Sequence, residues 1–387
     1  MRFPEFSGEW EMVSLQDIAT INPKSDPLQN TFIYIDLEAV EKGELRKIQE
    51  IMREEAPSRA QRVIDNNDIL FQCVRPYQKN NYIHRILNTS NQQWVASTGY
   101  AQIRTTELPN YIYHLLNTDE FNRKVMVRCT GSSYPAINSE DLATIHLYYT
   151  PDKKEQLKIS RLLDLLDKRI ATQNKIIEDL KKLKSAISKH LFARKDLLET
   201  TICLSNIATL KNDYAFQSGK YNALGKWKIL TITNVSGERY INDEDYNCII
   251  NLPNDIQDHQ VLKEGDILIS LTGNVGRVSL CKDGDYLLNQ RVGLLQLAKN
   301  VNQEFLYQIL SSQRFENSMI ACGQGAAQMN IGKGDVESYV LPYSSNVNNI
   351  LLVAKILHSY DEYIINEQRK LTLLTMQKQY FLAQMFI

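Results

Sequence analysis

Residues 151–195 read PDKKEQLKISRLLDLLDKRIATQNKIIEDLKKLKSAISKHLFARK, and this stretch decides the fold class. After Pro151, which the first turn of a helix tolerates, no glycine or proline interrupts the 44 residues from Asp152 to Lys195. The stretch predicts one helix of roughly 60 Å, at about 1.5 Å per residue, which is far longer than an average globular helix. A second uninterrupted stretch, from about Asn346 to Phe386, predicts a similar helix at the end of the chain.

Apolar residues in both stretches recur in alternating steps of three and four, which is the period of a coiled coil. Polar residues occupy matching steps in each, so we expect an antiparallel pair whose register places Lys184 opposite Glu367 and Gln173 opposite Lys378. An alternative is that these polar residues lie separately at a solvated edge. The expected seam comprises Leu166, Ile170, Ile177, Leu180, Lys184 and Ile187 of the first stretch and Tyr360, Ile364, Glu367, Leu371, Leu374 and Phe381 of the second.

The sequence repeats itself. LQDIATI at residues 15–21 recurs as LSNIATL at 204–210, and Asp-Ile-Leu at 68–70 recurs at 266–268. An order of matches that is kept along the whole chain argues against chance similarity. From residue 131 onward a constant offset of 194 relates the halves, and it pairs Gly131 with Gly325, Ile137 with Ile331, Leu163 with Leu357, Asp167 with Asp361, and Phe192 with Phe386.

Each half begins with runs typical of strands and short helices, at 32–37, 68–74 and 111–116 and again at 228–233, 266–271 and 305–310. Each half then ends in a long helix. The predicted fold is therefore α+β (mixed α/β), with two similar globular domains joined by two long antiparallel coiled-coil helices in a pseudo-twofold internal repeat. The expected boundaries are 1–151 for the first globular domain, 152–195 for the central helix, 196–345 for the second globular domain and 346–387 for the final helix.

Composition hides an uneven charge distribution. The chain carries 44 Lys+Arg and 45 Asp+Glu, a net charge of −1, which excludes a histone-like protein. Residues 152–195 alone hold 13 Lys+Arg and 6 Asp+Glu, a net +7, so the remainder carries −8. A charge-rich helix is usually a solvated face, although such an excess would also suit a phosphate backbone.

The motifs of catalytic and metal sites are missing from the sequence. The six cysteines form no CxxC pair and no cluster with histidines, and no Walker A motif is present. We therefore expect a binding protein with no catalytic residue and no metal site. The chain has no run of 18 apolar residues and no signal-peptide pattern, so we expect no membrane association and a cytoplasmic location.

Polar loops follow equivalent predicted strands in the two halves. Arginine, asparagine and glutamine read base edges through paired hydrogen bonds, and glycines let backbone amides approach phosphates. The same residue types are common in ordinary surface turns, which is the competing interpretation. The candidate nucleic-acid contacts are Arg75, Tyr77, Lys79, Ser132, Ser133 and Tyr134 in the first half, and Thr272, Asn274, Arg277, Gln290, Arg291, Gln324, Gln328 and Asn330 in the second.

Several short motifs occur in a fixed order along the chain: Arg2-Phe3-Pro4-Glu5-Phe6 with Gly8-Glu9-Trp10, Leu15 with Ile18-Ala19, Pro151, Glu155-Gln156, Leu162-Leu163 and Asp167 of the central helix, and the final Gln384-Met385-Phe386. Through these motifs and the repeat, the chain resembles the DNA-specificity subunits of type I restriction–modification systems over essentially its whole length. One departure lies in the second helix, where Asn349 and Ile350 stand in place of Glu155 and Gln156.

This resemblance implies a non-catalytic subunit with no cofactor of its own. Two target-recognition domains would each read one half of a bipartite double-stranded DNA sequence. The helices would hold these domains apart and dock methyltransferase subunits, with Glu155 and Gln156 as docking candidates. ATP-dependent restriction subunits, which translocate and cleave DNA, are further implied partners, and methylation would belong to the methyltransferase. The alternative is a coiled-coil interaction scaffold without DNA recognition, which the −8 charge outside the central helix slightly favours.

Overall fold

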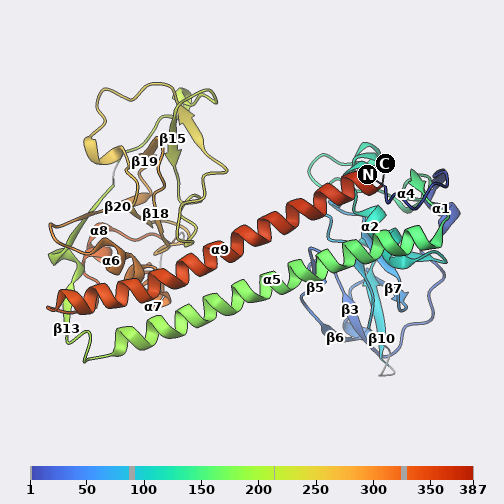
Figure 1. The fold of residues 1–387 in the computed structure, drawn as a ribbon, viewed down its shortest axis with the longest axis horizontal. Coiled ribbons are helices and arrows are strands. Elements are labelled where there is room, and N and C mark those ends of the chain that lie inside the picture. The colour runs from blue at the N-terminus through green and yellow to red at the C-terminus, as the bar shows by residue number, and fades with distance from the viewer. Residues whose placement is uncertain (1, 87–91, 213, 324–328, 387) are drawn as a thin grey trace. The chain divides into compact units, whose positions relative to one another are not determined.

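The computed structural model describes residues 2–86, 92–212, 214–323 and 329–386, and the chain divides into two compact units (Figure 1). One unit contains Met1–Asn174 with Lys370–Ile387, and the other contains Lys175–Arg369. Each unit therefore combines a globular part with a segment of both long helices, α5 (Lys153–Ala193) and α9 (Val347–Met385). The predicted α+β class and both long helices are confirmed. Within the described residues, no helix has the length and apolar character that a membrane crossing requires.

The globular part of the first unit is built on two four-stranded sheets, with the orders β6-β3-β10-β7 and β2-β11-β8-β9. Strand β10 pairs parallel with β3 and antiparallel with β7, whereas the second sheet is antiparallel. The elements of this part are β1 (Glu11–Ser14), α1 (Leu15–Ile18), β2 (Ala19–Ile21), β3 (Thr31–Ile35), β4 (Val40–Glu41), β5 (Glu44–Leu45), β6 (Gln49–Met52), β7 (Ala60–Ile64), β8 (Ile69–Gln72), β9 (Tyr82–Ile83), β10 (Gln93–Ser97), β11 (Tyr100–Thr105), α2 (Pro109–Leu116), α3 (Asp119–Arg128), α4 (Ser139–Ala143) and β12 (His146–Tyr149).

The globular part of the second unit follows the same plan with sheets ordered β14-β20-β17-β18 and β16-β15-β19. Strand β15 pairs parallel with β19, as β3 pairs with β10 in the first unit. The elements of this part are β13 (Thr200–Cys203), β14 (Ala208–Lys211), β15 (Trp227–Leu230), β16 (Asn247–Ile249), β17 (Ile267–Ser270), β18 (Val278–Leu280), β19 (Tyr286–Leu288), β20 (Val292–Leu297), α6 (Gln303–Leu310), α7 (Gln313–Cys322), α8 (Lys333–Glu337) and β21 (Val340–Tyr343).

The internal repeat extends to the ends of individual elements. Helices α2, α3 and α4 and strand β12 have the same lengths as α6, α7, α8 and β21, and their bounds differ by 194. The local cause is also repeated, because Thr118 and Ser312 each cap the following helix by accepting a hydrogen bond from the backbone amide three residues on. Those amides belong to Phe121 and Phe315, which are both buried in the cores of their units.

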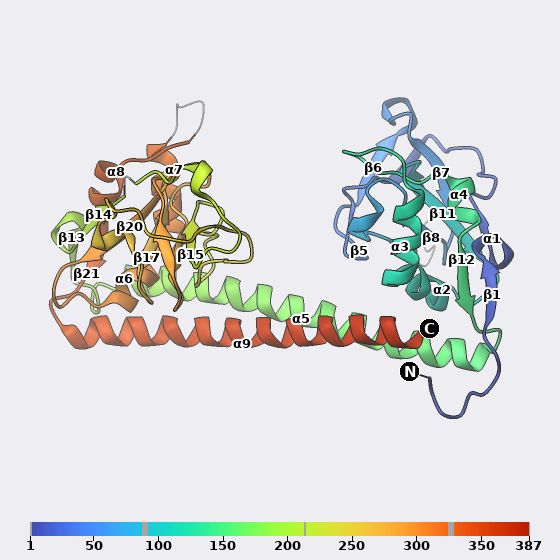
Figure 2. The same cartoon turned by 90° about the horizontal axis from the view of Figure 1, so that it is seen from above.

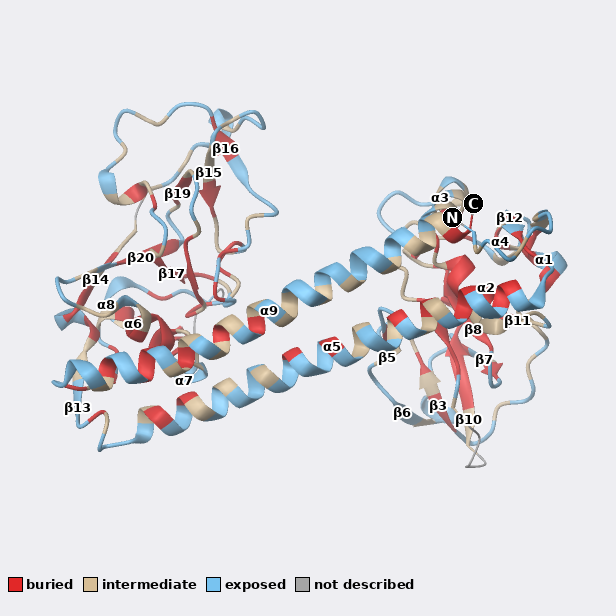
Figure 3. Cartoon of the chain, viewed as in Figure 1, coloured by how far each residue is buried: buried red, intermediate tan, exposed pale blue. Residues whose placement is uncertain are grey.

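Each core includes both long helices. In the first unit, Leu163 and Leu166 of α5 belong to one cluster with Met385 and Phe386, beside α2, β8 and β11 (Figure 2). In the second unit, Leu191 clusters with the early part of α9, namely Ile350, Val353 and Leu357. Within each unit, therefore, the segments of α5 and α9 run antiparallel. Buried and exposed residues alternate along both helices (Figure 3), as expected of helices with one apolar face.

Candidate nucleic-acid interface

Three loops of the first unit meet at the end of strand β8. The Cys73 amide donates to the carbonyl of Gly99 at 3.0 Å, and the Cys73 carbonyl accepts from the amide of Ile137 at 3.1 Å. The amide of Arg75 donates to Pro135 at 2.7 Å. We call residues 73–79, 97–99 and 130–137 the first loop junction. Backbone hydrogen bonds hold its three segments together, so side chains that are distant in sequence come to share one surface.

The second unit has an equivalent arrangement at the end of β17. Leu271 donates to the carbonyl of Arg291 at 3.0 Å and accepts from Ile331 at 2.9 Å, and Gly273 donates to Met329 at 2.9 Å. Gly273 has a φ of +73°, which a glycine adopts without strain. We call residues 271–277, 289–291 and 329–331 the second loop junction. The two junctions share backbone pairing and differ in side chains.

The first loop junction gathers most of the side chains predicted for the first half. The Arg75 guanidinium lies 4.3 Å from the ring centroid of Tyr134, a cation–π contact that orients both groups. Tyr77 and Tyr134 are 50% and 63% exposed, and Ser132 and Ser133 are exposed beside them. Lys79 has a structural contact instead, because its ammonium bonds to Asp119 at 2.5 Å and so ties the loop to α3.

The second loop junction exposes Asn274, Gln290, Arg291 and Asn330. Two predicted residues are engaged within the protein. Thr272 is buried and donates from its hydroxyl to the Asn330 side chain at 2.8 Å, and Arg277 faces Glu316 at 3.6 Å. Gln324 and Gln328, which were predicted as contacts, lie outside the described residues.

Sequence reasoning missed an arginine beside the first loop junction. Arg62 lies on β7 opposite Ala96 of β10, and its Nε atom is shielded from solvent without a hydrogen-bond partner. Burial lowers the pKa of its guanidinium. Arg62 stands within a strand and is followed by the apolar residues Val63 and Ile64, and no motif in the sequence marks it.

The seam residues line the inner faces of the helices, since none of the twelve is exposed. The predicted pairing of their polar members is wrong, however. The Lys184 ammonium bonds to Asp361 at 2.5 Å, six residues before the expected Glu367. Lys378 pairs with Asp167, again six residues before the expected Gln173. Apolar packing within each unit sets the register, and the long lysine side chains reach carboxylates beside the seam.

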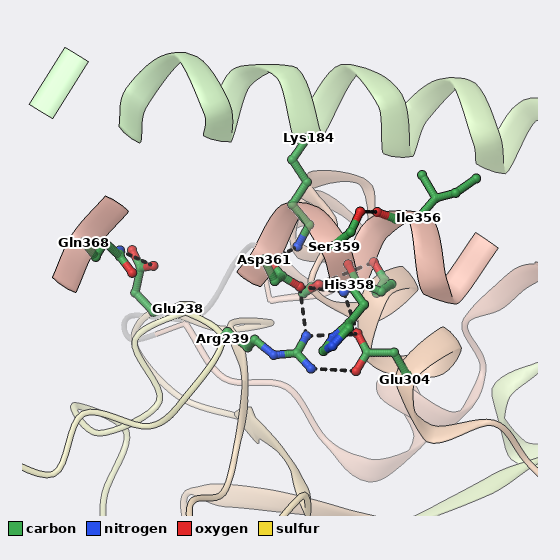
Figure 4. A network of polar contacts seen from close by, with 11 residues as sticks. Lys184, Glu238, Arg239, Glu304, Ile356, His358, Ser359, Asp361 and Gln368 are labelled. Atoms are coloured by element: carbon green, nitrogen blue, oxygen red, sulfur yellow. Dashed lines mark hydrogen bonds and ion pairs between the residues drawn. The ribbon is translucent and has the colours of Figure 1, made fainter. Parts of the chain in front are cut away.

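The Lys184–Asp361 pair belongs to a buried polar network in the second unit (Figure 4). Arg239 donates to Asp361 at 2.9 Å and makes a two-pronged contact with Glu304 of α6. Gln308 donates to both carboxylates, at 2.7 Å and 2.6 Å. Burial by itself would lower the pKa of Arg239, but the two carboxylates hold it above its ordinary value. The network joins the globular part of the unit to α5 and α9.

Glu155 and Gln156 are fully buried, which corrects their prediction as direct docking contacts. Both oxygens of Glu155 accept from the Arg2 guanidinium at 2.6 Å, and Gln156 donates to the carbonyl of Thr150 at 2.8 Å. Glu155 thus fixes the N-terminal arm to the start of α5. Its replacement in the second half, Asn349, instead donates to Leu197, so it holds the segment that leads into the second globular part.

No group of histidine, cysteine, aspartate or glutamate that could hold a metal ion occurs among the described residues. The described side chains of the two loop junctions include hydrogen-bond donors, aromatic rings and guanidinium groups. Such groups suit the recognition of base edges and phosphates.

Comparison with known proteins supports the repeat and the family together. The family model for the type I restriction modification DNA specificity domain matches residues 7–182 and again residues 199–376. The chain is 27% identical over 233 residues to the type I restriction enzyme MjaVIII specificity subunit of Methanocaldococcus jannaschii, covering 54% of this chain and 53% of that protein. It is 24% identical over 195 residues to the HindI specificity subunit of Haemophilus influenzae, covering 49% and 39%. The alignments thus span about half the length, or less, of the curated relatives that the chain matches.

Solved structures share the fold over nearly the whole chain. A chain from a structure of type I restriction–modification complex assembly aligns with a TM-score of 0.59 and 19% identity, covering 97% of both chains. The specificity subunit of M. genitalium aligns with a TM-score of 0.58 and 15% identity, covering 98% of this chain and 96% of that one. With both halves matched by one family model, the chain belongs to the type I restriction–modification DNA specificity family.

Proposed function

We propose that this chain is the non-catalytic DNA sequence-specificity subunit of a type I restriction–modification complex. In this proposal each loop junction contacts one half of a bipartite double-stranded DNA sequence. The observation that carries the proposal is the repeated junction itself, in which one backbone framework presents two different sets of exposed side chains. A shared framework with divergent side chains is what two readers of two different half-sites require.

The two loop junctions differ in their side chains, and this difference supports recognition of a different half-site by each unit. The first loop junction offers Arg75, Tyr77 and Tyr134, whereas the second offers Asn274, Gln290 and Arg291. Arginine favours guanine, and asparagine and glutamine favour adenine, because each makes two hydrogen bonds to that base in the major groove. The proposed target is therefore asymmetric.

The proposed partners are double-stranded DNA, methyltransferase subunits and ATP-dependent restriction subunits. The methyltransferase would dock on the exposed faces of α5 and α9 and would supply S-adenosylmethionine chemistry on a flipped base. The complex would act in the cytoplasm, where chromosomal DNA is accessible. This chain would contribute recognition and positioning, with no catalytic residue.

An exchange of one unit tests the two-reader proposal. Residues 196–344 are replaced by the corresponding segment of a relative, and the chimera is expressed with its methyltransferase partner in a host whose methylome is sequenced. We expect one half-site to change and the other to remain, because each loop junction is built within one unit. A change in both half-sites, or in neither, contradicts the proposal.

A scaffold without DNA recognition makes a different prediction. The wild-type complex with its methyltransferase should then bind its methylated motif and a scrambled duplex equally at every salt concentration. Sequence recognition with phosphate contacts instead predicts tighter binding to the motif and a steep loss of affinity with salt. A gel-shift series from about 50 to about 200 mM salt separates the two outcomes, because DNA affinity that depends on phosphate contacts falls steeply over that range.

A further inference from the structure

Arg62 is a partly buried arginine for which the fold provides no acceptor. Its Nε atom is shielded from solvent and has no hydrogen-bond partner, and among the described residues Arg62 takes part in no ion pair. The buried Arg239 also leaves its Nε atom without a hydrogen-bond partner, but its other guanidinium nitrogens pair with Glu304 and Asp361. The partly buried Arg104 pairs with Asp68 and Asp65, whereas Arg62 has no carboxylate partner among the described residues. Shielding an arginine without an acceptor is costly, so a group that persists in this state calls for an external partner.

Arg62 lies next to the first loop junction. It is the second residue after Ala60, which pairs across the sheet with Ser97, and the carbonyl of Arg59 accepts from the amide of Thr98. Residues 97–99 are one of the three segments of the junction. Cys73, the residue on which the other two segments converge, donates from its backbone amide to Gly99 of this same segment. The arginine therefore stands at the edge of the proposed DNA surface.

The second unit has no such arginine at the equivalent place. Val63 pairs with Val95 of β10, and Val261 pairs with Leu287 of β19, so Gln260 corresponds to Arg62. Gln260 is 3% exposed, and its side-chain oxygen accepts from the Gln257 amide at 2.7 Å. The second unit thus fills this position with a neutral group whose oxygen is bonded internally. An arginine present in one reader and absent from the other matches a role in one half-site.

We propose that Arg62 contacts DNA in the first half-site and donates to acceptor oxygens of a phosphate or of a guanine edge. This inference rests on the proposed function of the first loop junction. DNA would supply the acceptor that the fold lacks, and the sheet would hold the arginine in place before binding.

The test compares wild type with R62Q, which installs the side chain of the second unit, and with R62K. The control is R46Q, because Arg46 is a surface arginine that pairs with Glu41 and Glu44. Each chain is purified in complex with the methyltransferase. Binding constants are measured at several salt concentrations on four duplexes: the methylated motif, the motif with either half-site scrambled, and a fully scrambled sequence.

We expect R62Q to weaken binding of the intact motif by about 5- to 150-fold, the range for loss of one specific contact, and R46Q to change it less than twofold. If Arg62 reads a guanine, the loss disappears on the duplex with a scrambled first half-site. If it contacts a phosphate, the loss is equal on all four duplexes and the salt slope falls by about one. R62K should recover part of the phosphate contact and little of the guanine contact.

Two outcomes overturn the inference while leaving the two-reader proposal intact. One is that R62Q keeps the sequence specificity of wild type and binds the intact motif with an affinity within twofold of wild type. The other is a thermal midpoint of R62Q well below that of wild type, which would make Arg62 a structural residue. We expect the opposite, an equal or higher midpoint, because the substitution removes an unpaired cation. Absence of sequence-specific binding by the wild-type complex would instead contradict both proposals.

Discussion

His114 and Gln308 show how one position serves both halves with different chemistry. His114 is fully buried in α2, and its Nε2 lies 2.9 Å from Asp164 of α5. Gln308 stands 194 residues later and donates to Asp361 of α9. Both residues join a short helix of the globular part to a long helix. His114 contributes a ring nitrogen to this contact, whereas Gln308 contributes an amide nitrogen.

Asp164 makes the first unit sensitive to acid. Burial by itself would raise the pKa of Asp164, but hydrogen bonds from His114 and Asn110, together with the nearby Arg85, hold it below its ordinary value of 3.8. A carboxyl whose pKa is lower in the folded state stabilises the fold above its unfolded pKa, and that contribution is lost as pH falls through the folded pKa. We therefore expect the first unit to lose stability below about pH 4.

D164N should flatten this acid dependence and lower stability near neutral pH by about 1–3 kcal/mol, because hydrogen bonds to a charged acceptor are lost. Denaturation is followed by tryptophan fluorescence in a W227F background, which leaves Trp10 and Trp94 as reporters of the first unit. D179N, an exposed change on the same helix, is the matched control and should leave the profile unchanged. An acid profile of D164N identical to that of wild type would refute the assignment.

The long helices are held by two ion pairs that the repeat relates. Asp167 and Lys184 of α5 stand 194 residues before Asp361 and Lys378 of α9, and the pairs are Lys184–Asp361 and Asp167–Lys378. Their environments differ. The Asp361 side chain is 8% exposed and also accepts from Arg239, whereas that of Asp167 is 35% exposed. We therefore expect the equivalent ion pairs to contribute differently to the stability of the two units.

D361N should destabilise the second unit by about 3–5 kcal/mol, since it leaves Arg239 and Lys184 without their shared carboxylate. D167N is the matched control, and we expect a loss of about 1 kcal/mol or less at this more exposed pair. Hydrogen exchange of peptides from α6 and α2 assigns each effect to its unit. Equal losses in the two variants would show that burial does not decide the contribution of these pairs.

Carboxylates on other parts of the chain neutralise part of the positive charge of the central helical stretch. Six of the 13 basic residues in 152–195 form ion pairs with carboxylates: Lys153 with Glu107, Lys158 with Glu5, Lys181 with Glu238, Lys182 with Glu178, Lys184 with Asp361, and Arg194 with Asp196. Part of the +7 excess thus meets acidic residues that belong to the −8 remainder. This pairing favours the loop junctions over α5 as the surface for the proposed DNA recognition.

Across the whole molecule, each compact unit is discontinuous in sequence. The core of the first unit includes Met385 and Phe386, which are 5% and 4% exposed, and the Phe386 ring contacts Trp10 and Tyr111 edge-on or tilted. The last residues of the chain therefore complete the core of the first globular part, more than 200 residues away in sequence.

A substitution at the end of α9 should consequently unfold the beginning of the chain. We expect F386A to cost about 3–5 kcal/mol and to raise hydrogen exchange in residues 109–116, while residues 303–310 keep their protection. Y380A, on the exposed side of the same helix, is the control and should leave both segments protected. Loss of protection in the second unit alone would contradict this division of the chain.

The sequence by itself determined the architecture. A 194-residue repeat, uninterrupted helical stretches and a three–four apolar period depend on residue type and spacing, so they predicted the α+β class, the long helices and the inward seam. It also pointed to residues in all three segments of the second loop junction and in two of the three segments of the first, but not in 97–99. Those features are local or periodic, which is why they can be recognised without coordinates.

Only the tertiary structure decided which polar groups meet. In the structure Lys184 pairs with Asp361, and the buried Glu155 pairs with Arg2. Lys79 pairs with Asp119, and the Nε atom of Arg62 has no hydrogen-bond acceptor. Lysine and arginine side chains are long and flexible, so each could pair with any of several carboxylates, and the sequence alone does not specify which one. The apolar packing of each core fixes the backbones first, and the partner of each charged group follows from the distances that remain.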